Sequence, residues 1–326
     1  MKTRIAVTAC LVSLLIGRSA WTQIAPPTYD YIKTGVLEAK IDSSSGSPQL
    51  VINGQAIPPL LFFFNNSYPD RMQFLAPQVR AANAAGIHLF SMVFYNWPWD
   101  PGDAAHPPDY SQSNSQMDQF LAIDPHAAFL LRIPAGPPPS WSGWATHAQW
   151  GKNEDILHSD GTTTIDSVAS NVYLQALLSG VTNMVQHYEA SAYASHILGY
   201  HITGANTGEW FPDQYREKGL DYSPANTTAF RSWLQQKYGT DAALSNAWGR
   251  SVTINTAPIP IPVAGRFPIH SAASAATTDP VPSFYRLPAE QDWVDYSAYT
   301  SDIFSSQILA IAHAVRTATI NPAISR

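Results

Sequence analysis

Cysteine and charge are both scarce in this chain. Of the 326 residues only Cys10 is a cysteine, and it lies in the N-terminal apolar run. Beyond that run the chain therefore has no disulfide, no thiolate nucleophile and no cysteine-based metal site. Asp, Glu, Lys and Arg make up 13% of the residues, against roughly 25% in typical globular proteins. The formal net charge of -6 provides no basic footprint for nucleic acid.

Several motifs of well-known enzyme classes are also missing. No G-x-G-x-x-G follows the first predicted strand, so a dinucleotide-binding sheet has little support. No G-x-S-x-G turn indicates an esterase. The ten histidines show no H-E-x-x-H or similar spacing, so we predict no metal and no cofactor.

Aromatic residues are plentiful, with 10 Trp, 15 Tyr and 13 Phe. Exposed aromatic side chains over a polar framework suit a neutral, hydroxyl-rich ligand such as a sugar. Packing in the core is the alternative role for most of them.

The first residues are typical of an export signal. Lys2 and Arg4 precede an apolar run from residue 5 to 16, which is shorter than the roughly 20 residues that span a bilayer. We therefore predict a cleaved signal at residues 1–22, a secreted or periplasmic protein, and no membrane span.

Strands alternate with helices along the rest of the chain. Residues 23–57 are predicted to form an N-terminal extension with a β-hairpin around the sequence SSSGS. Four apolar runs of strand length follow, at residues 57–66, 87–94, 126–134 and 196–204. Runs without polar alternation are typical of strands buried on both faces of a parallel sheet.

Helical periodicity follows each of these runs. The predicted helices lie at residues 69–86, 110–124, 167–189 and 290–319, and a long loop insertion at 211–288 holds two more at 223–239 and 241–249. Pro77 predicts a kink or two short helices in the first of them. Open sheets and closed barrels both fit this alternation.

The distinctive residues favour a barrel because they follow the C-terminal ends of the strands, where β/α barrels carry their active sites. A closed (β/α)8 TIM barrel needs eight units. We therefore predict an α/β fold of this type in residues 58–326, truncated after about four units.

The stretch GYHITGANTGEWF, Gly199 to Phe211, places one carboxylate just beyond the fourth strand. Gly204 and Gly208 permit a tight turn there. Trp210 and its neighbour Phe211 would desolvate Glu209 and raise its pKa, which suits a general acid. An ordinary exposed glutamate is the alternative.

Other candidates for substrate contacts lie near the same strand ends. Arg132 would bind a substrate hydroxyl or orient Glu209, or else form an internal salt bridge. Trp97, Trp141 and Trp210 would stack against sugar rings or pack in loops. His201 would point into the barrel or serve as a hydrogen-bonded core histidine.

The two motifs GYHITGANTGEWF and FRSWLQQKYGTDAALSNAWG occur in this order. Together they resemble the catalytic-barrel entry of family 42 glycoside hydrolases, the β-galactosidase-like group of the retaining barrel clan. The looser sequence DPHAAFLLRIPAGPPPSW agrees upstream. The resemblance implies that Glu209 is the acid/base residue and that the substrate is a β-glycoside or an oligo- or polysaccharide.

The chain departs from the family pattern in two places. The clan has asparagine directly before the acid/base glutamate, whereas this chain has Gly208 there and Asn206 two residues earlier. Asn206 is therefore only a candidate for the contact with the sugar 2-hydroxyl. The family's nucleophile is a glutamate at the end of the seventh strand, which we expect to lie outside this chain.

A retaining glycosidase needs two carboxyl groups about 5–5.5 Å apart. Asp100 and Asp103 are the in-chain acids that best fit as partners of Glu209, whereas Glu290, Asp292 and Asp295 are predicted to stabilise the start of the last helix. Two rival functions stay open, a carbohydrate-binding protein without catalysis and a β-amylase-like hydrolase. The sequence leaves the oligomeric state open.

Overall fold

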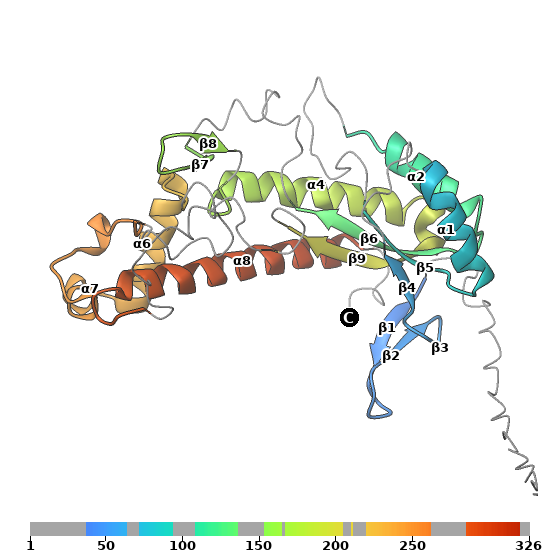
Figure 1. The fold of residues 1–326 in the computed structure, drawn as a ribbon, viewed down its shortest axis with the longest axis horizontal. Coiled ribbons are helices and arrows are strands. Elements are labelled where there is room, and N and C mark those ends of the chain that lie inside the picture. The colour runs from blue at the N-terminus through green and yellow to red at the C-terminus, as the bar shows by residue number, and fades with distance from the viewer. Residues whose placement is uncertain are drawn as a thin grey trace, which may run out of the picture.

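Four parallel strands form the central sheet of the computed structural model (Figure 1). The structure describes residues 37–63, 72–93, 108–135, 153–164, 167–204, 210, 220–261 and 285–319. The sheet has the order β4-β5-β6-β9, with bounds Leu61–Phe63, Leu89–Val93, Ala128–Pro134 and Ile197–Thr203. Within this sheet the strands stand side by side in the order in which they occur in the chain, as in a barrel. A doubly wound sheet instead reverses its strand order. The four predicted strands are confirmed.

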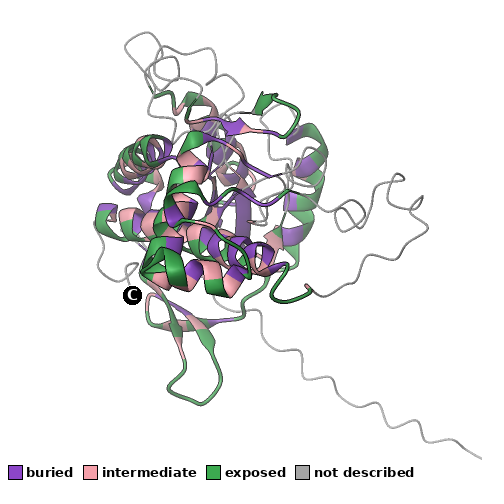
Figure 2. Cartoon of the chain, turned by 90° about the vertical axis from the view of Figure 1, so that its left-hand side faces the viewer, coloured by how far each residue is buried: buried purple, intermediate pink, exposed green. Residues whose placement is uncertain are grey.

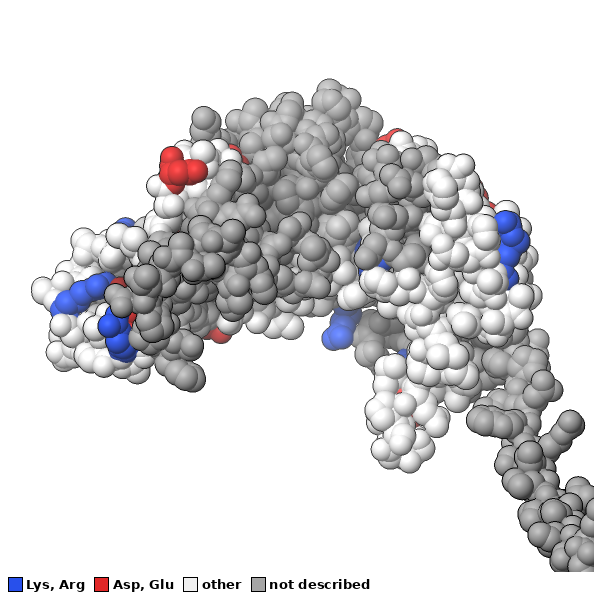
Figure 3. Space-filling view, viewed as in Figure 1, with Lys and Arg blue, Asp and Glu red and all other residues white. Residues whose placement is uncertain are grey.

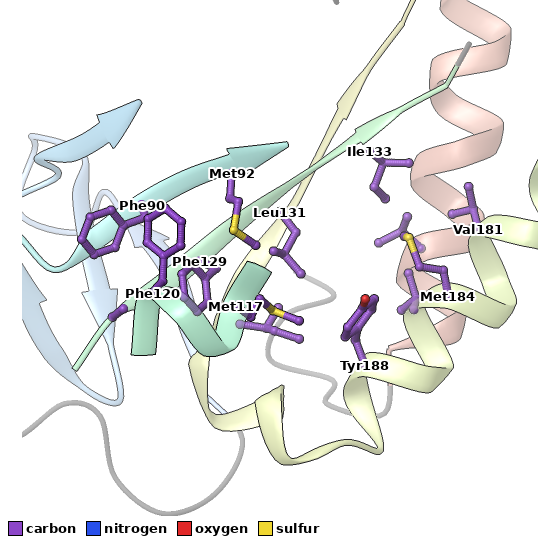
Figure 4. Close-up of a cluster of buried hydrophobic side chains, with 14 of the residues drawn as sticks. Phe90, Met92, Met117, Phe120, Phe129, Leu131, Ile133, Val181, Met184 and Tyr188 are labelled. Atoms are coloured by element: carbon purple, nitrogen blue, oxygen red, sulfur yellow. The ribbon is translucent and has the colours of Figure 1, made fainter. Parts of the chain in front are cut away.

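One face of this sheet is covered by helices (Figure 4). They are α1 (Met72–Ala84), α2 (Ser111–Leu121), α4 (Asn171–Glu189) and α8 (Gln291–Ala318). Their buried side chains form one apolar cluster with alternate residues of the strands. In Figure 2 the buried residues accordingly lie along the strands and the inner sides of the helices. Burial of this helix-facing side is the main source of stability for the four units.

Helix α1 corrects one sequence-based expectation. It runs without a break from Met72 to Ala84, with Pro77 inside it, so the prediction of two short helices is wrong. Pro77 removes one backbone donor near the start of the helix. The buried residues Met72, Leu75 and Val79 hold both sides of that position against the core.

A small antiparallel sheet covers the other face of the central sheet at the N-terminal ends of its strands. Its strands are β1 (Ala39–Asp42), β2 (Gln49–Ile52) and β3 (Gln55–Ile57). The predicted hairpin is confirmed, and β3 adds a third strand through a turn at Asn53 and Gly54, whose φ values are 47° and 82°. Leu37, Ile52 and Ile57 pack there against Leu89, Ala128 and Leu198.

Several short elements and a capped helix lie between β6 and β9. A two-stranded hairpin, β7 (Ile156–Leu157) and β8 (Thr163–Thr164), lies after β6, and the 3-10 helix η3 (Ala192–His196) leads into β9. The hydroxyl of Ser170 accepts the backbone N–H of Tyr173 at 3.0 Å and caps α4.

A second apolar core lies in a group of helices that we call the helical lobe, defined as residues 220–261 and the first half of α8. It contains α6 (Pro224–Tyr238), α7 (Asp241–Trp248) and the 3-10 helix η4 (Ile254–Thr256). Ser223 caps α6 by accepting the backbone N–H of Asn226, at the start predicted for this helix. The aromatic residues of this core come from α6, α7 and α8.

Asp295 joins these helices through a carboxylate that is fully buried. It accepts hydrogen bonds from Lys237 Nζ, Tyr238 Oη and Trp248 Nε1, each at 2.8 Å. The prediction that Asp295 stabilises the helix start stays a prediction; the structure adds that donors from α6 and α7 also surround it. Asp292 similarly pairs with Arg250 at 2.8 Å.

Glu189 ends α4 with a buried carboxyl group. The hydroxyl of Tyr200 donates to its Oε1 at 3.0 Å, and its Oε2 has no hydrogen-bond partner among the described residues. Burial raises the pKa of Glu189, and the bond from Tyr200 opposes this only in part. The negative end of the α4 dipole also disfavours a charge at this position.

We expect Glu189→Gln to be more heat-stable than the unsubstituted protein at about pH 8 and to lose this advantage toward about pH 4. A pKa raised by folding contributes stability below the unfolded pKa, and that contribution is lost as pH rises through the folded pKa. Glutamine has no such loss. Thermal unfolding across this pH range checks the prediction, with the exposed Glu38→Gln as control. A difference in melting temperature that shrinks as pH rises would contradict it.

No helix in the described part of the chain is long and apolar enough to cross a membrane.

Candidate functional site

The C-terminal ends of the four parallel strands lie along one edge of the central sheet. Phe63, Val93, Pro134 and Thr203 end these strands. Parallel strands with helices on one face place such ends together, and in β/α barrels this edge carries the active site. Among the described residues, no group of His, Cys, Asp or Glu is placed to hold a metal ion.

Four of the predicted site residues fall outside the described ranges. They are Glu209, Asn206, Trp97 and Trp141, together with the alternative acids Asp100 and Asp103. Arg132, His201 and Trp210 are described, so the geometry of the site is built on these three.

Arg132 and His201 lie opposite each other on neighbouring strands of the sheet. Phe129, Leu131 and Ile133 of β6 belong to the helix-facing core. Because side chains alternate along a strand, Arg132 points to the opposite face. The structure thus brings Arg132 and His201 together on the face that would line the inside of a barrel.

Arg132 is a buried cation near the end of β6, with a relative exposure of 5%. Its guanidinium lies over the ring of Phe63 from β4, with Cζ 4.1 Å from the ring centroid. Burial lowers the pKa of Arg132 to about 10, so the side chain stays charged at neutral pH. It provides a fixed positive charge, planar and rich in donors, for a hydroxyl or carboxylate.

His201 is exposed on the same face in the described part of the chain, and both roles expected for it stay predictions. Partial loss of solvent around the imidazole ring lowers the pKa of His201, and the positive charge of Arg132 lowers this pKa further. A neutral imidazole at neutral pH can both donate and accept a hydrogen bond. Such a side chain suits contacts with sugar hydroxyl groups.

Trp210 adjoins Glu209 in sequence and lies just past the end of β9. Its indole Nε1 donates to the carbonyl of Ile202 at 3.1 Å, and its backbone N–H donates to the carbonyl of Gly204 at 3.1 Å. The ring also packs edge-on against Phe304 of α8, with centroids 6.4 Å apart. The substrate-stacking role of Trp210 stays a prediction.

Gly204 has a purpose beyond the one expected from the sequence. Its backbone does not use the left-handed region, and the tight turn expected after it falls on residues outside the described ranges. A Cβ at Gly204 would lie 2.6 Å from three ring atoms of Trp210. The glycine is thus required because the indole occupies the space of a side chain.

Sequence reasoning missed Phe63 and Phe304 as neighbours of the site. Phe63 follows Phe62, which packs on the helix-facing core. Strand alternation alone would have placed Phe63 on the inner face. No comparable signal points to Phe304, because it lies about 94 residues beyond Trp210 in the chain.

Comparison with known proteins supports the architecture seen here. A family model described as Beta-galactosidase, glycoside hydrolase family 42, matches residues 67–256. The chain belongs to this family. All seven predicted site residues of the family 42 chain lie within the matched range.

Individual relatives agree at low identity. Beta-galactosidase BglY of Alicyclobacillus acidocaldarius is 23% identical over 189 residues, which are 56% of this chain and 24% of that protein. The structure of the β-galactosidase from the psychrophilic Marinomonas ef1 superposes with a TM-score of 0.55 at 15% identity, over 80% of this chain and 35% of that one.

The catalytic domain of the β-amylase from Paenibacillus polymyxa gives a TM-score of 0.58 at 14% identity, over 81% of this chain and 63% of that one. At such identities the structural likenesses show the fold alone, a β/α barrel of which this chain forms a part. The family 42 chain spans about a quarter of the length of the curated relatives it matches.

Proposed function

We propose that this protein is a retaining β-galactosidase-like glycoside hydrolase in which Glu209 is the general acid/base. The match of residues 67–256 to family 42 is the observation that carries the proposal. Glu209 follows β9, the fourth strand of the parallel sheet, by six residues. In this role it protonates the glycosidic oxygen and later deprotonates the attacking water.

The described inner face supports the binding of a neutral sugar. It presents Arg132, His201 and Phe63, which offer a fixed cation, a neutral imidazole and an aromatic ring. Figure 3 shows the Lys, Arg, Asp and Glu side chains of the described residues as separate groups on the visible face, without one large charged patch. A neutral, hydroxyl-rich substrate fits this distribution of charge.

The second carboxylate is not on the four described strands. Their residues on the side away from the helices are Leu61, Phe63, Leu89, Ser91, Val93, Ala128, Leu130, Arg132, Pro134, Leu198, Gly199, His201 and Thr203. None of them is acidic. We propose that the nucleophile comes from a part of the protein outside these strands.

We also propose that the protein is exported, which the apolar run at residues 5–16 supports.

The stereochemistry of the first product tests the proposal. We expect that NMR of early hydrolysis of phenyl β-galactoside by the complete gene product shows β-galactose before mutarotation. Release of α-galactose would overturn retention and favour a β-amylase-like, inverting mechanism. If tryptophan fluorescence shows that galactose binds but phenyl β-galactoside is not hydrolysed, a carbohydrate-binding protein is favoured.

A further inference from the structure

Trp210 has a backbone conformation that bulky residues rarely adopt. Its φ is 56°, in the left-handed region, a strained conformation that persists only where the surroundings impose it. The carbonyl groups of Ile202 and Gly204 accept its two N–H groups. Its ring packs over Gly204 and against Phe304. Trp210 is thus tied to the end of β9 and to α8 at once.

One of these ties joins Trp210 directly to Gly204. It is the backbone bond from Trp210 N to Gly204 O, at 3.1 Å. Glu209 is the residue directly before Trp210, so its Cα lies about 3.8 Å from the Cα of Trp210 across one peptide unit. The contacts of Trp210 therefore act on the residue bonded directly to Glu209.

We propose that Trp210 is the positioning residue for Glu209, with Gly204 providing the space and Phe304 the support. The role rests on the proposed function of Glu209. A strand and a long helix provide the anchor, and sites held by such rigid elements are more accurately placed than sites on loops alone. Accurate placement matters because a shift of about 1 Å in a catalytic group lowers rates by roughly 100-fold.

Two substitutions loosen the anchor by different means. Trp210→Phe keeps an aromatic ring over Gly204 and beside Phe304 but removes the bond from Nε1 to Ile202. Gly204→Ala keeps the tryptophan but forces its ring to move, because the new Cβ would lie 2.6 Å from ring atoms. Trp233→Phe is the matched control, since the half-buried Trp233 donates its own Nε1 to Asp302 at 2.8 Å in the helical lobe.

The test compares kcat/KM for phenyl β-galactoside and 2,4-dinitrophenyl β-galactoside with the complete gene product. The phenolate is a poor leaving group that needs a well-placed acid, whereas the dinitrophenolate leaves without one. We expect Trp210→Phe and Gly204→Ala to lower kcat/KM for the phenyl glycoside by roughly 10- to 100-fold. The value for the dinitrophenyl glycoside should stay within about twofold, and Trp233→Phe should change neither.

Each other outcome decides against the role or against the function beneath it. An equal loss on both substrates, or no loss, overturns positioning by Trp210, because general damage to the fold lowers both values together. If Gly204→Ala does not fold, Trp210→Phe alone decides. A selective loss in Glu209→Gln without one in Trp210→Phe leaves the proposed function standing and removes only this role. Cleavage of neither substrate by the unsubstituted protein overturns both.

Discussion

Replacement of Glu209 with glutamine is expected to lower kcat/KM for phenyl β-galactoside by about 10²- to 10⁴-fold, the usual contribution of a general acid. Glutamine has nearly the same shape but cannot release a proton to the departing oxygen. The dinitrophenolate of the dinitrophenyl glycoside leaves without protonation, so for this substrate we expect a much smaller loss of kcat/KM. Steady-state kinetics on the two substrates measure both effects.

Added azide gives a second readout of the same residue. In Glu209→Ala the glycosyl-enzyme waits for a base to activate water, whereas the azide anion attacks without one. We expect azide to raise kcat for the dinitrophenyl glycoside and to yield β-galactosyl azide. The exposed Glu38→Gln, beside β1, is the control and should behave like the unsubstituted protein. Equal losses on both substrates, with no effect of azide, would contradict the acid/base role.

Removal of the carboxylate of Asp295 is expected to lower the free energy of unfolding by roughly 2–4 kcal/mol. Trp248 is only 3% exposed. In Asp295→Ala its indole N–H loses its acceptor inside the helical lobe. The hydroxyl of Tyr238 loses the same acceptor. Lys237 contributes less, because its side chain is 37% exposed and can turn to solvent.

Urea denaturation checks the size of this effect, and the chain offers a matched control. Asp302 also lies on α8 and also accepts an indole N–H, from Trp233 at 2.8 Å, but it is exposed. We expect Asp302→Ala to cost no more than about 0.5 kcal/mol. Similar losses in the two variants would show that burial of the Asp295 network is not what stabilises the lobe.

Local patterns in the sequence predicted the elements well where one neighbourhood decides the outcome. The helices at α4 and α6 begin within a few residues of the predicted starts, and Ser170 and Ser223 cap them. The apolar runs became strands whose helix-facing side is buried along its length, and whose other side is buried by the small antiparallel sheet at the N-terminal ends. Of the two alternatives predicted for Pro77, the break into two short helices failed because tertiary packing of α1 outweighed a local helix-breaking tendency.

The site was predicted only in part, and the gaps have a common cause. The strand-end position of Arg132 follows from the sequence pattern alone, but its contact with Phe63 joins two strands about 69 residues apart. The exposure of His201 likewise depends on what packs over its face of the sheet. Neither fact is encoded in the residues nearby.

The sequence by itself determined the alternation of strands and helices, the family, and the candidate acid Glu209 at the end of the fourth strand. Only the tertiary structure decided why Gly204 is a glycine, what surrounds Asp295, and which side chains hold Trp210. The physical reason is distance along the chain. Periodicity and caps arise between residues within a turn or two of each other, whereas the space beside Gly204 is filled by a ring that α8 supports from about 100 residues away.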